Sequence, residues 1–270
     1  MRQIDDFRAE VAELATVLER LDEPAWETVT QFKGYTIADL VRHLHQGDHM
    51  GLLSAESPER FQAVLAERRA QRTAGLSPRD DARRQFGHLT GRALLEVWKA
   101  RADRLADVLA ALGPDARLKW SGPDMGVRMF ATARQMEVWS HGHDVYDIQG
   151  LDRTPTDRLE NIAVIGVRTF GWTFVNRGLP VPPAPPHVRL EAPSGAVWQW
   201  HEGSAGGHVA GSALEFCQVV TQVRSVADTR LDVSGDTATR WMAIAQCFAG
   251  PPEAPPAKGT RHKLAAAGRA

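Results

Sequence analysis

Residues 134–144 read Arg-Gln-Met-Glu-Val-Trp-Ser-His-Gly-His-Asp, and this stretch gives the strongest indication of the fold. It lies in a predicted helix over about residues 128–146. Glu137 and His141 are four positions apart, so they lie one turn apart on the same face of that helix. The same face carries further small or polar side chains: Ala133, Ser140 and Asp144. A carboxylate and an imidazole placed in this way offer two metal ligands from one rigid helix, as in metal sites within helix bundles.

A second predicted helix, residues 36–51, carries a candidate third ligand. It opens with Thr36-Ile37-Ala38-Asp39, which resembles a capping box with Asp in place of Glu. His43 lies on the predicted inward stripe of this helix, whereas His45 and His49 form a separate pair on another face. Helical geometry therefore favours His43 over His45. Two histidines and one carboxylate would leave the fourth position of a tetrahedral zinc ion open, as in catalytic zinc sites. On spacing alone, such a Glu–His pair is more often a surface or buried hydrogen-bonded pair than a metal site.

The remaining periodic segments predict an up-down bundle of four or five helices over residues 1–178. Apolar residues recur at helical spacing over 4–22 and 89–112, and a further helix is predicted over 155–176. Residues 57–84 are rich in arginine with interspersed acidic residues. A phosphate or acidic-substrate site is one interpretation of this segment, but charge alternation favours a solvated helix face.

The sequence changes character at residues 179–186, where five of eight residues are proline. No helix or central strand tolerates that composition, so a domain linker is predicted. Alternating strand patterns and capped helices follow, which predicts a small α+β domain over residues 187–250. Residues 251–270 are rich in Pro, Ala and basic residues and are predicted to be a disordered tail. The fold class is therefore α+β overall.

Composition excludes several classes of function. The chain has 270 residues with 32 Lys and Arg against 33 Asp and Glu, and a nucleic-acid-binding protein should carry a basic surplus. No apolar run is long enough to span a membrane, and the first residues do not resemble a signal peptide. The only two cysteines, Cys217 and Cys247, cannot form a disulfide framework, and they lie at apolar positions where thiols are inert. We therefore expect a cytoplasmic protein without nucleic-acid or membrane partners.

Two motifs of this chain resemble those of the mycothiol-dependent maleylpyruvate isomerase family. The first comprises Trp26, Thr30, Gly34-Tyr35-Thr36, Asp39-Leu40-Val41 and His43-Leu44. The second comprises Arg134, Glu137, His141 and Asp144. Val233-Ser234-Gly235-Asp236 is similar to part of the sterol-carrier-like α+β domain that follows the bundle in that family. The resemblance covers about residues 7–250, and the chain departs from the family in Tyr35, where Trp is usual, in its proline-rich linker and in its long basic tail.

The resemblance implies a DinB-like metal-binding helical bundle in which His43, Glu137 and His141 hold a divalent metal, zinc in these isomerases. It also implies mycothiol, a low-molecular-weight thiol of actinobacteria, as co-substrate. Thiolate addition to maleylpyruvate, rotation and elimination would give the trans isomer, whereas an S-transferase would keep the adduct. Asp144 is the natural residue to orient a ligating histidine, although it could equally accept from Arg134 or a helix end. Arg134 either contacts a substrate carboxylate or pairs with an acidic residue inside the bundle.

Three functional hypotheses remain open on these grounds. The favoured one is a mycothiol-dependent isomerase or S-transferase that acts on a small-molecule substrate as a monomer or homodimer. The second is a metal-dependent hydrolase that uses the same three residues with water as nucleophile. The third is a non-catalytic small-ligand-binding protein. The other histidines of the first half of the chain are predicted to face solvent or a rim: His45, His49, His88 and His143.

Overall fold

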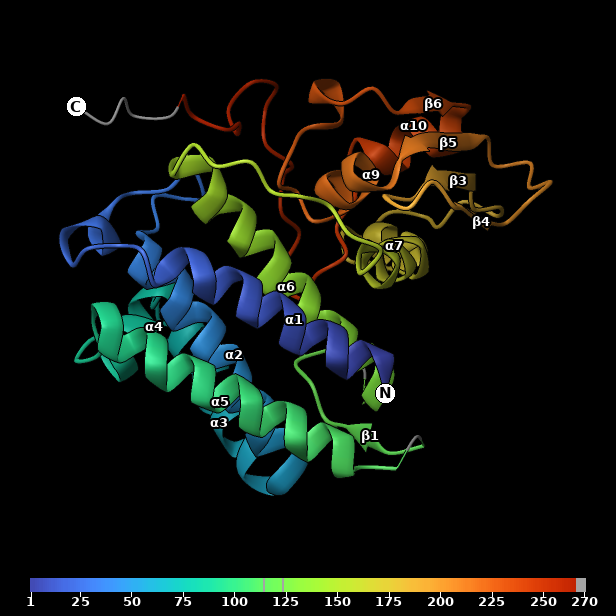
Figure 1. The fold of residues 1–270 in the computed structure, drawn as a ribbon. Helices are drawn as coiled ribbons and strands as arrows, with labels where there is room; N and C mark the ends of the chain where they lie inside the picture. Colours follow the sequence, from blue (N-terminus) through green and yellow to red (C-terminus); the bar gives the residue numbers. More distant parts are fainter. Residues whose placement is uncertain (114, 123, 266–270) are drawn as a thin grey trace. The chain divides into compact units, whose positions relative to one another are not determined.

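The computed structural model describes residues 1–113, 115–122 and 124–265, and the chain divides into two compact units, Met1–Ile148 and Gln149–Ala270 (Figure 1). Each unit is described by itself. The predicted mixed α+β class is confirmed. The elements of the first unit are α1 (Arg2–Leu18), the short 3-10 helix η1 (Pro24–Glu27), α2 (Ile37–Glu56), α3 (Pro58–Thr73), α4 (Pro78–Phe86), α5 (Gly91–Ala111), the two-stranded ribbon β1 (Arg117–Leu118) and β2 (Met125–Gly126), and α6 (Val127–Ile148).

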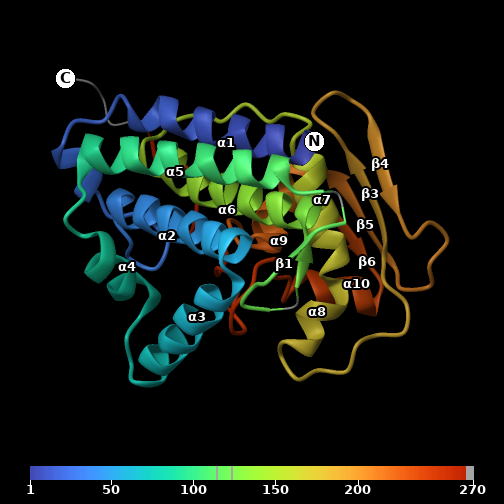
Figure 2. The same ribbon diagram turned by 90° about the horizontal axis from the view of Figure 1, so that it is seen from below.

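Four long helices form the centre of the first unit. Helix α1 packs against α5 and α6, and α2 packs against α5, so the four helices lie side by side (Figure 2). Their facing stripes are apolar because the sequence places large hydrophobic residues at helical spacing. Residues with no more than 1 % exposure include Phe7, Leu14, Leu40, Leu44, Leu94, Trp98, Leu105 and Phe130. Helices α3 and α4 pack on α2.

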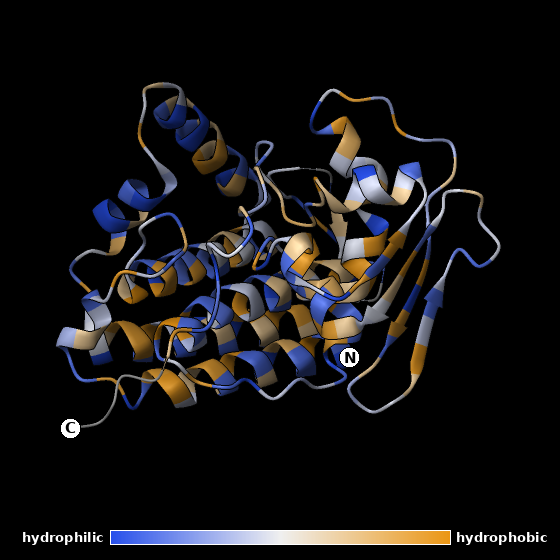
Figure 3. Cartoon of the chain, turned by 90° about the horizontal axis from the view of Figure 1, so that it is seen from above, coloured by the Kyte–Doolittle hydropathy of each residue, from blue (hydrophilic) through white to orange (hydrophobic). Residues whose placement is uncertain are grey.

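Hydropathy follows the same pattern along the chain. Hydrophobic and hydrophilic residues alternate around the helices, as expected for amphipathic elements with one buried face (Figure 3). The segment expected to form a solvated helix face does form α3 and α4, which are mostly exposed but bury Phe61 and Leu65. Among the described residues, no helix combines the length and apolar character needed to cross a bilayer.

The predicted capping box at the start of α2 is present, and its aspartate, Asp39, also pairs with Arg83. The Thr36 side chain accepts from the Asp39 N–H, and the Thr36 N–H donates to the Asp39 carboxylate. Arg83 of α4 donates from Nε and Nη2 to the two oxygens of Asp39 at 2.6 Å each. Burial raises the pKa of Asp39, but the hydrogen bonds from Arg83 and Thr36 outweigh it and hold the pKa below its ordinary value. This carboxylate therefore sets the start of α2 and ties it to α4.

The second unit contains a four-stranded mixed sheet with helices. Its elements are α7 (Leu159–Arg168), α8 (Phe170–Val175), β3 (His187–Glu191), β4 (Val197–Trp200), β5 (His208–Ser212), α9 (Ala213–Val220), η2 (Val226–Asp228), β6 (Asp232–Ser234) and α10 (Asp236–Met242). The strand order is β4-β3-β5-β6. Strands β3 and β5 are parallel, and the other two pairings are antiparallel. Val188, Leu190 and Val209 on one face of the sheet are fully buried.

The boundary between the units lies after Ile148, whereas the sequence pattern placed the end of the bundle at residue 178. The segment expected as one helix over 155–176 forms two, α7 and α8, and both belong to the second unit. The reason is close packing of α7 on α9. A Cβ at Gly166 would lie only 2.9 Å from a Val220 methyl carbon and 3.0 Å from the Phe216 ring, so only glycine permits this approach. Tertiary contacts of this kind leave no local signal in the sequence.

The predicted disorder of residues 251–270 is wrong for residues 251–265, and residues 266–270 lie outside the described part of the chain. The Gly259 N–H donates to Asp228 at 2.9 Å, and the Gln222 side chain donates to the Glu253 carbonyl at 3.0 Å. Arg261 is 9 % exposed and donates to the Gln222 carbonyl. Hydrogen bonds between backbone groups and side chains thus hold a segment whose composition lacks the large apolar residues that usually indicate order.

We expect Asp39→Ala to lower the free energy of unfolding by about 2–4 kcal/mol, because it removes a helix cap and leaves Arg83 without its partner. The matched control is Glu56→Ala, which removes an exposed carboxylate paired with Arg104 and should cost less than about 1 kcal/mol. Urea denaturation followed by circular dichroism measures both. Equal losses in the two variants would contradict the role given to Asp39.

Candidate metal centre

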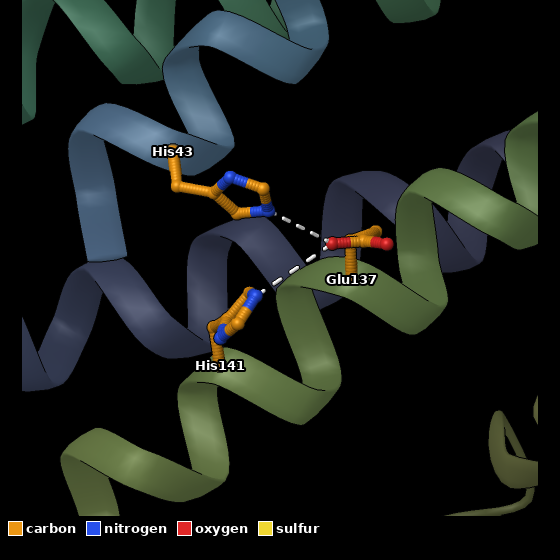
Figure 4. A group of neighbouring side chains, drawn as sticks. All are labelled: His43, Glu137 and His141. Carbon is orange, nitrogen blue, oxygen red and sulfur yellow. Dashed lines mark hydrogen bonds and ion pairs between the residues drawn. The ribbon is translucent and has the colours of Figure 1, made fainter. Parts of the chain in front are cut away.

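Helices α2 and α6 bring His43, Glu137 and His141 together (Figure 4). The Nε2 atom of His43 lies 3.2 Å from Oε2 of Glu137, and the Nε2 atom of His141 lies 3.6 Å from the same oxygen. Each residue offers one ligand atom, and these atoms all lie within 4.8 Å of one another. Among the described residues, these three side chains form the one group of histidine, cysteine or acidic residues that lie close enough together to share a metal ion.

The donor set fits a small divalent cation. Zinc bonds of 2.0–2.1 Å in tetrahedral geometry place two neighbouring ligand atoms about 3.3 Å apart, and the two nitrogen–oxygen separations lie close to that value. The side chains are 34 % exposed for His43, 22 % for Glu137 and 8 % for His141. Of the three side chains, His43 and Glu137 are therefore the ones more accessible to solvent.

The charges of the three groups are strongly coupled. Burial raises the pKa of Glu137, but hydrogen bonds from His141 and His43 outweigh it and hold the pKa well below its ordinary value. Burial lowers the pKa of His43 below its ordinary value despite the hydrogen bond to Glu137. For His141 burial also lowers the pKa, but its hydrogen bonds to Asp144 and Glu137 outweigh that effect and raise it. The site thus presents an ionised carboxylate between two imidazoles.

Asp144 lies behind His141, where the sequence predicted it. Its Oδ2 atom is 3.3 Å from Nδ1 of His141, and its side chain is 2 % exposed. Because Nδ1 is occupied by Asp144, Nε2 points toward Glu137. A carboxylate in this position fixes the tautomer and the ring orientation of a ligating histidine.

Phe32 forms a wall of the site that sequence reasoning missed. Its ring packs edge-to-face on His141 with the centroids 4.9 Å apart. A tight turn holds it there, with Lys33 at φ 49° and Gly34 at φ 69°, and the Thr30 hydroxyl donates to the Tyr35 carbonyl. Gly34 in the first motif was the available signal for this turn, because such a backbone conformation favours glycine. The phenyl ring keeps one side of His141 apolar.

Arg134 lies inside the bundle and forms an ion pair there, which is one of the two roles predicted for it. Its Nε donates to Oδ1 of Asp48 at 2.9 Å, and its Nη2 donates to the Leu44 carbonyl. The side chains of Arg134 and Asp48 are 4 % and 0 % exposed. A Cβ at Gly47 would lie 2.6 Å from the guanidinium, so glycine makes room for this pair.

Four further histidines of this unit were predicted to face solvent or the rim of the site. The prediction is wrong for two of them, which are buried. His45 is 1 % exposed and His143 is 5 % exposed. The reason is that α4 covers one face of α2, where the ring centroids of Phe86 and His45 lie 4.7 Å apart. The rings of Trp139 and His143 pack at a tilt, with their centroids 4.3 Å apart. His49 is half-buried and His88 is exposed. Burial lowers the pKa of His45 to about 3 and that of His49 to about 4, with Arg101 adding to both shifts.

Both cysteines are buried free thiols in the second unit. Burial raises the pKa of Cys217 well above its ordinary value. A thiolate, and not a thiol, is the nucleophile in sulfur chemistry, so Cys217 is not a candidate nucleophile at neutral pH.

The first unit matches a protein-family model. Residues 7–146 match the mycothiol maleylpyruvate isomerase N-terminal domain, and this range contains all three candidate ligands. Over 249 residues the chain is 38 % identical to "Uncharacterized protein Rv0036c" of Mycobacterium tuberculosis (strain ATCC 25618 / H37Rv), which covers 92 % of this chain and 96 % of the relative. The match to "Uncharacterized protein MT0041" of M. tuberculosis strain CDC 1551 / Oshkosh has the same identity and the same coverage of both chains.

Solved structures share the fold at low sequence identity. A crystal structure of the mycothiol-dependent maleylpyruvate isomerase aligns with a TM-score of 0.53 and 15 % identity, over 81 % of this chain and 87 % of that chain. A mutant of that isomerase aligns with a TM-score of 0.54 and 16 % identity over the same shares. Likeness at this level of identity indicates a common architecture.

We expect Arg134→Met to lower the free energy of unfolding by about 3–5 kcal/mol, because it leaves the Asp48 carboxylate buried without its charged partner. The double variant Asp48→Asn with Arg134→Met should regain part of that loss, since no buried charge is then unpaired. Arg128→Met, an exposed arginine on the same helix, is the control. Urea denaturation of the four proteins measures the effect, and wild-type stability of Arg134→Met would rule out the structural role.

Proposed function

Because the chain belongs to the mycothiol maleylpyruvate isomerase family, we propose that it is a metalloenzyme that activates a low-molecular-weight thiol for addition to an electrophilic small molecule. We propose mycothiol as the thiol and zinc as the metal. The observation that carries the proposal is the convergence of His43, Glu137 and His141 on one point within the matched residues 7–146. The crystal structures with the same fold are of an enzyme that depends on mycothiol.

In this proposal the side chains have distinct roles. His43, Glu137 and His141 hold the ion, and Asp144 keeps the His141 ring in the orientation that directs Nε2 toward it. A bound zinc ion would lower the pKa of a coordinated thiol, so that the thiolate would form at neutral pH. Phe32 keeps water from one side of His141. The partial exposure of His43 and Glu137 leaves the path by which thiol and substrate enter.

The proposed reaction begins with thiolate addition to an activated carbon–carbon double bond. A sulfur–carbon bond forms, and the electron pair of the double bond moves toward the neighbouring carbonyl group. The former double bond can then rotate. Expulsion of the thiolate restores the double bond in the trans form, as in maleylpyruvate isomerisation, whereas protonation of the carbon retains the sulfur and gives an S-conjugate. We assign Arg134 no role in these steps, because its guanidinium is already paired with Asp48 inside the bundle.

We expect Glu137→Gln to weaken metal binding by at least about 10- to 100-fold, because a neutral amide replaces the only charged ligand. Metal content after dialysis against a chelator series, measured by mass spectrometry, tests this. His49→Gln is the matched control, since it changes a half-buried histidine of α2 that lies outside the three ligands, and it should retain the metal. Unchanged metal content in Glu137→Gln would exclude Glu137 as a ligand.

Turnover should require both the metal and the thiol. With maleylpyruvate as substrate, we expect conversion to the trans isomer only when mycothiol is present, and restored conversion when zinc is returned to chelator-treated protein. Liquid chromatography with mass spectrometry separates the trans isomer from an S-conjugate. Hydrolysis of ester or amide substrates that persists after complete removal of mycothiol would instead support a metal-dependent hydrolase. Metal-free protein as purified would contradict both enzymatic proposals.

A further inference from the structure

A second cluster of basic groups lies on the other side of α2 from the candidate metal centre. His43 points toward Glu137 of α6. His45, two residues further along α2, instead packs edge-to-face on Phe86 of α4 at 4.7 Å. His49 and Arg101 of α5 lie beside the same phenyl ring, at 6.4 Å and 5.7 Å. One aromatic ring thus has three nitrogen-bearing side chains around it.

Two nitrogens of this cluster are buried without a hydrogen-bond partner. They are Nδ1 of His45 and Nη1 of Arg101. His45 is only 1 % exposed. Buried polar atoms in folded proteins are nearly always hydrogen-bonded, because an unmet donor costs free energy. Two such atoms, on side chains that contact the same phenyl ring, therefore point to a missing hydrogen-bond partner.

Part of the positive charge in and around the cluster is not matched by an ion pair. Arg101, Arg68 and Arg60 all lie close enough to His49 to lower its pKa. The neighbouring carboxylates are already engaged: Asp81 with Arg68 and Arg84, Asp48 with Arg134 and Trp98, and Glu56 with Arg104. No ion pair is recorded for Arg101 or Arg60 among the described residues. Positive charge therefore exceeds negative charge where the unmet donors lie.

We propose that this cluster, His45, His49, Arg68 and Arg101, binds an oxyanion, the phosphate or carboxylate group of a small molecule. Arginine presents a planar set of N–H donors that matches both groups, and charge-assisted hydrogen bonds of this kind are the strong ones. The arginine-rich segment before α5, which sequence pattern assigned to a solvated face, supplies Arg68 from α3. The proposal uses none of the three candidate metal ligands and stands independently of the proposed enzymatic reaction.

Isothermal titration calorimetry with inorganic phosphate, and separately with succinate, tests the proposal on the full chain in a buffer free of both anions. We expect saturable binding of at least one anion with one site per chain. Arg101→Gln should weaken it about 10-fold or more, because it removes a charged donor with an unmet N–H. The matched control is Arg104→Gln, three residues along the same helix, where the arginine is exposed and paired with Glu56.

The outcomes separate this site from other anion binding. Loss of affinity in Arg101→Gln with full affinity in Arg104→Gln supports the site, provided thermal unfolding shows both variants folded. Equal weakening in the two variants would mean general attraction to a basic surface and would overturn the proposal. Binding retained in Glu137→Gln supports a location away from the metal ligands, whereas its loss there would assign the anion to the metal centre and overturn the proposal. Absence of saturable binding of both anions would also overturn it.

Discussion

The buried ion pair between Asp48 and Arg134 is the constraint on which the first unit depends. Both oxygens of Asp48 are used, one by Arg134 of α6 and the other by the indole N–H of Trp98 of α5. One carboxylate thus joins three of the four central helices. Breaking such a pair leaves a charge in an apolar interior, so slippage of α2 along α6 is strongly disfavoured. His43 and Glu137 lie within two turns of this pair on their helices, and their 3.2 Å approach follows from that fixed register.

Much of the candidate site could be predicted because its determinants are local. The four-residue spacing of Glu137 and His141 and the phase of His43 on α2 follow from helical periodicity, and the capping box at Thr36 fixes where that phase begins. The choice of His43 over His45 rested on the same geometry, and the structure places only His43 beside Glu137. A resemblance to a known family added the chemistry, and the family match covers those residues.

The features that could not be predicted depend on contacts between segments far apart in the sequence. Helical and strand periodicity contains no information about such contacts. Burial of His45 requires α4 to fold over α2, and the contact of Phe32 with His141 requires a turn with two left-handed residues. The assignment of α7 to the second unit depends on the close approach of Gly166 to Val220. Order in residues 251–265 depends on backbone groups of one segment meeting side chains of another. In each case the decisive partner lies far away in the sequence.

Helix α2 presents different chemistry on its two sides, and its start is anchored by Thr36 and Asp39. An α-helix turns about 100° per residue. Loss of two residues between the anchor and His43 would therefore rotate the helix by about 200°. After that rotation His45 would face Glu137. The side of the helix that now faces the candidate metal centre would face Phe86. Within this stretch of α2, a short deletion would thus exchange which of the two histidines faces Glu137 without altering either residue.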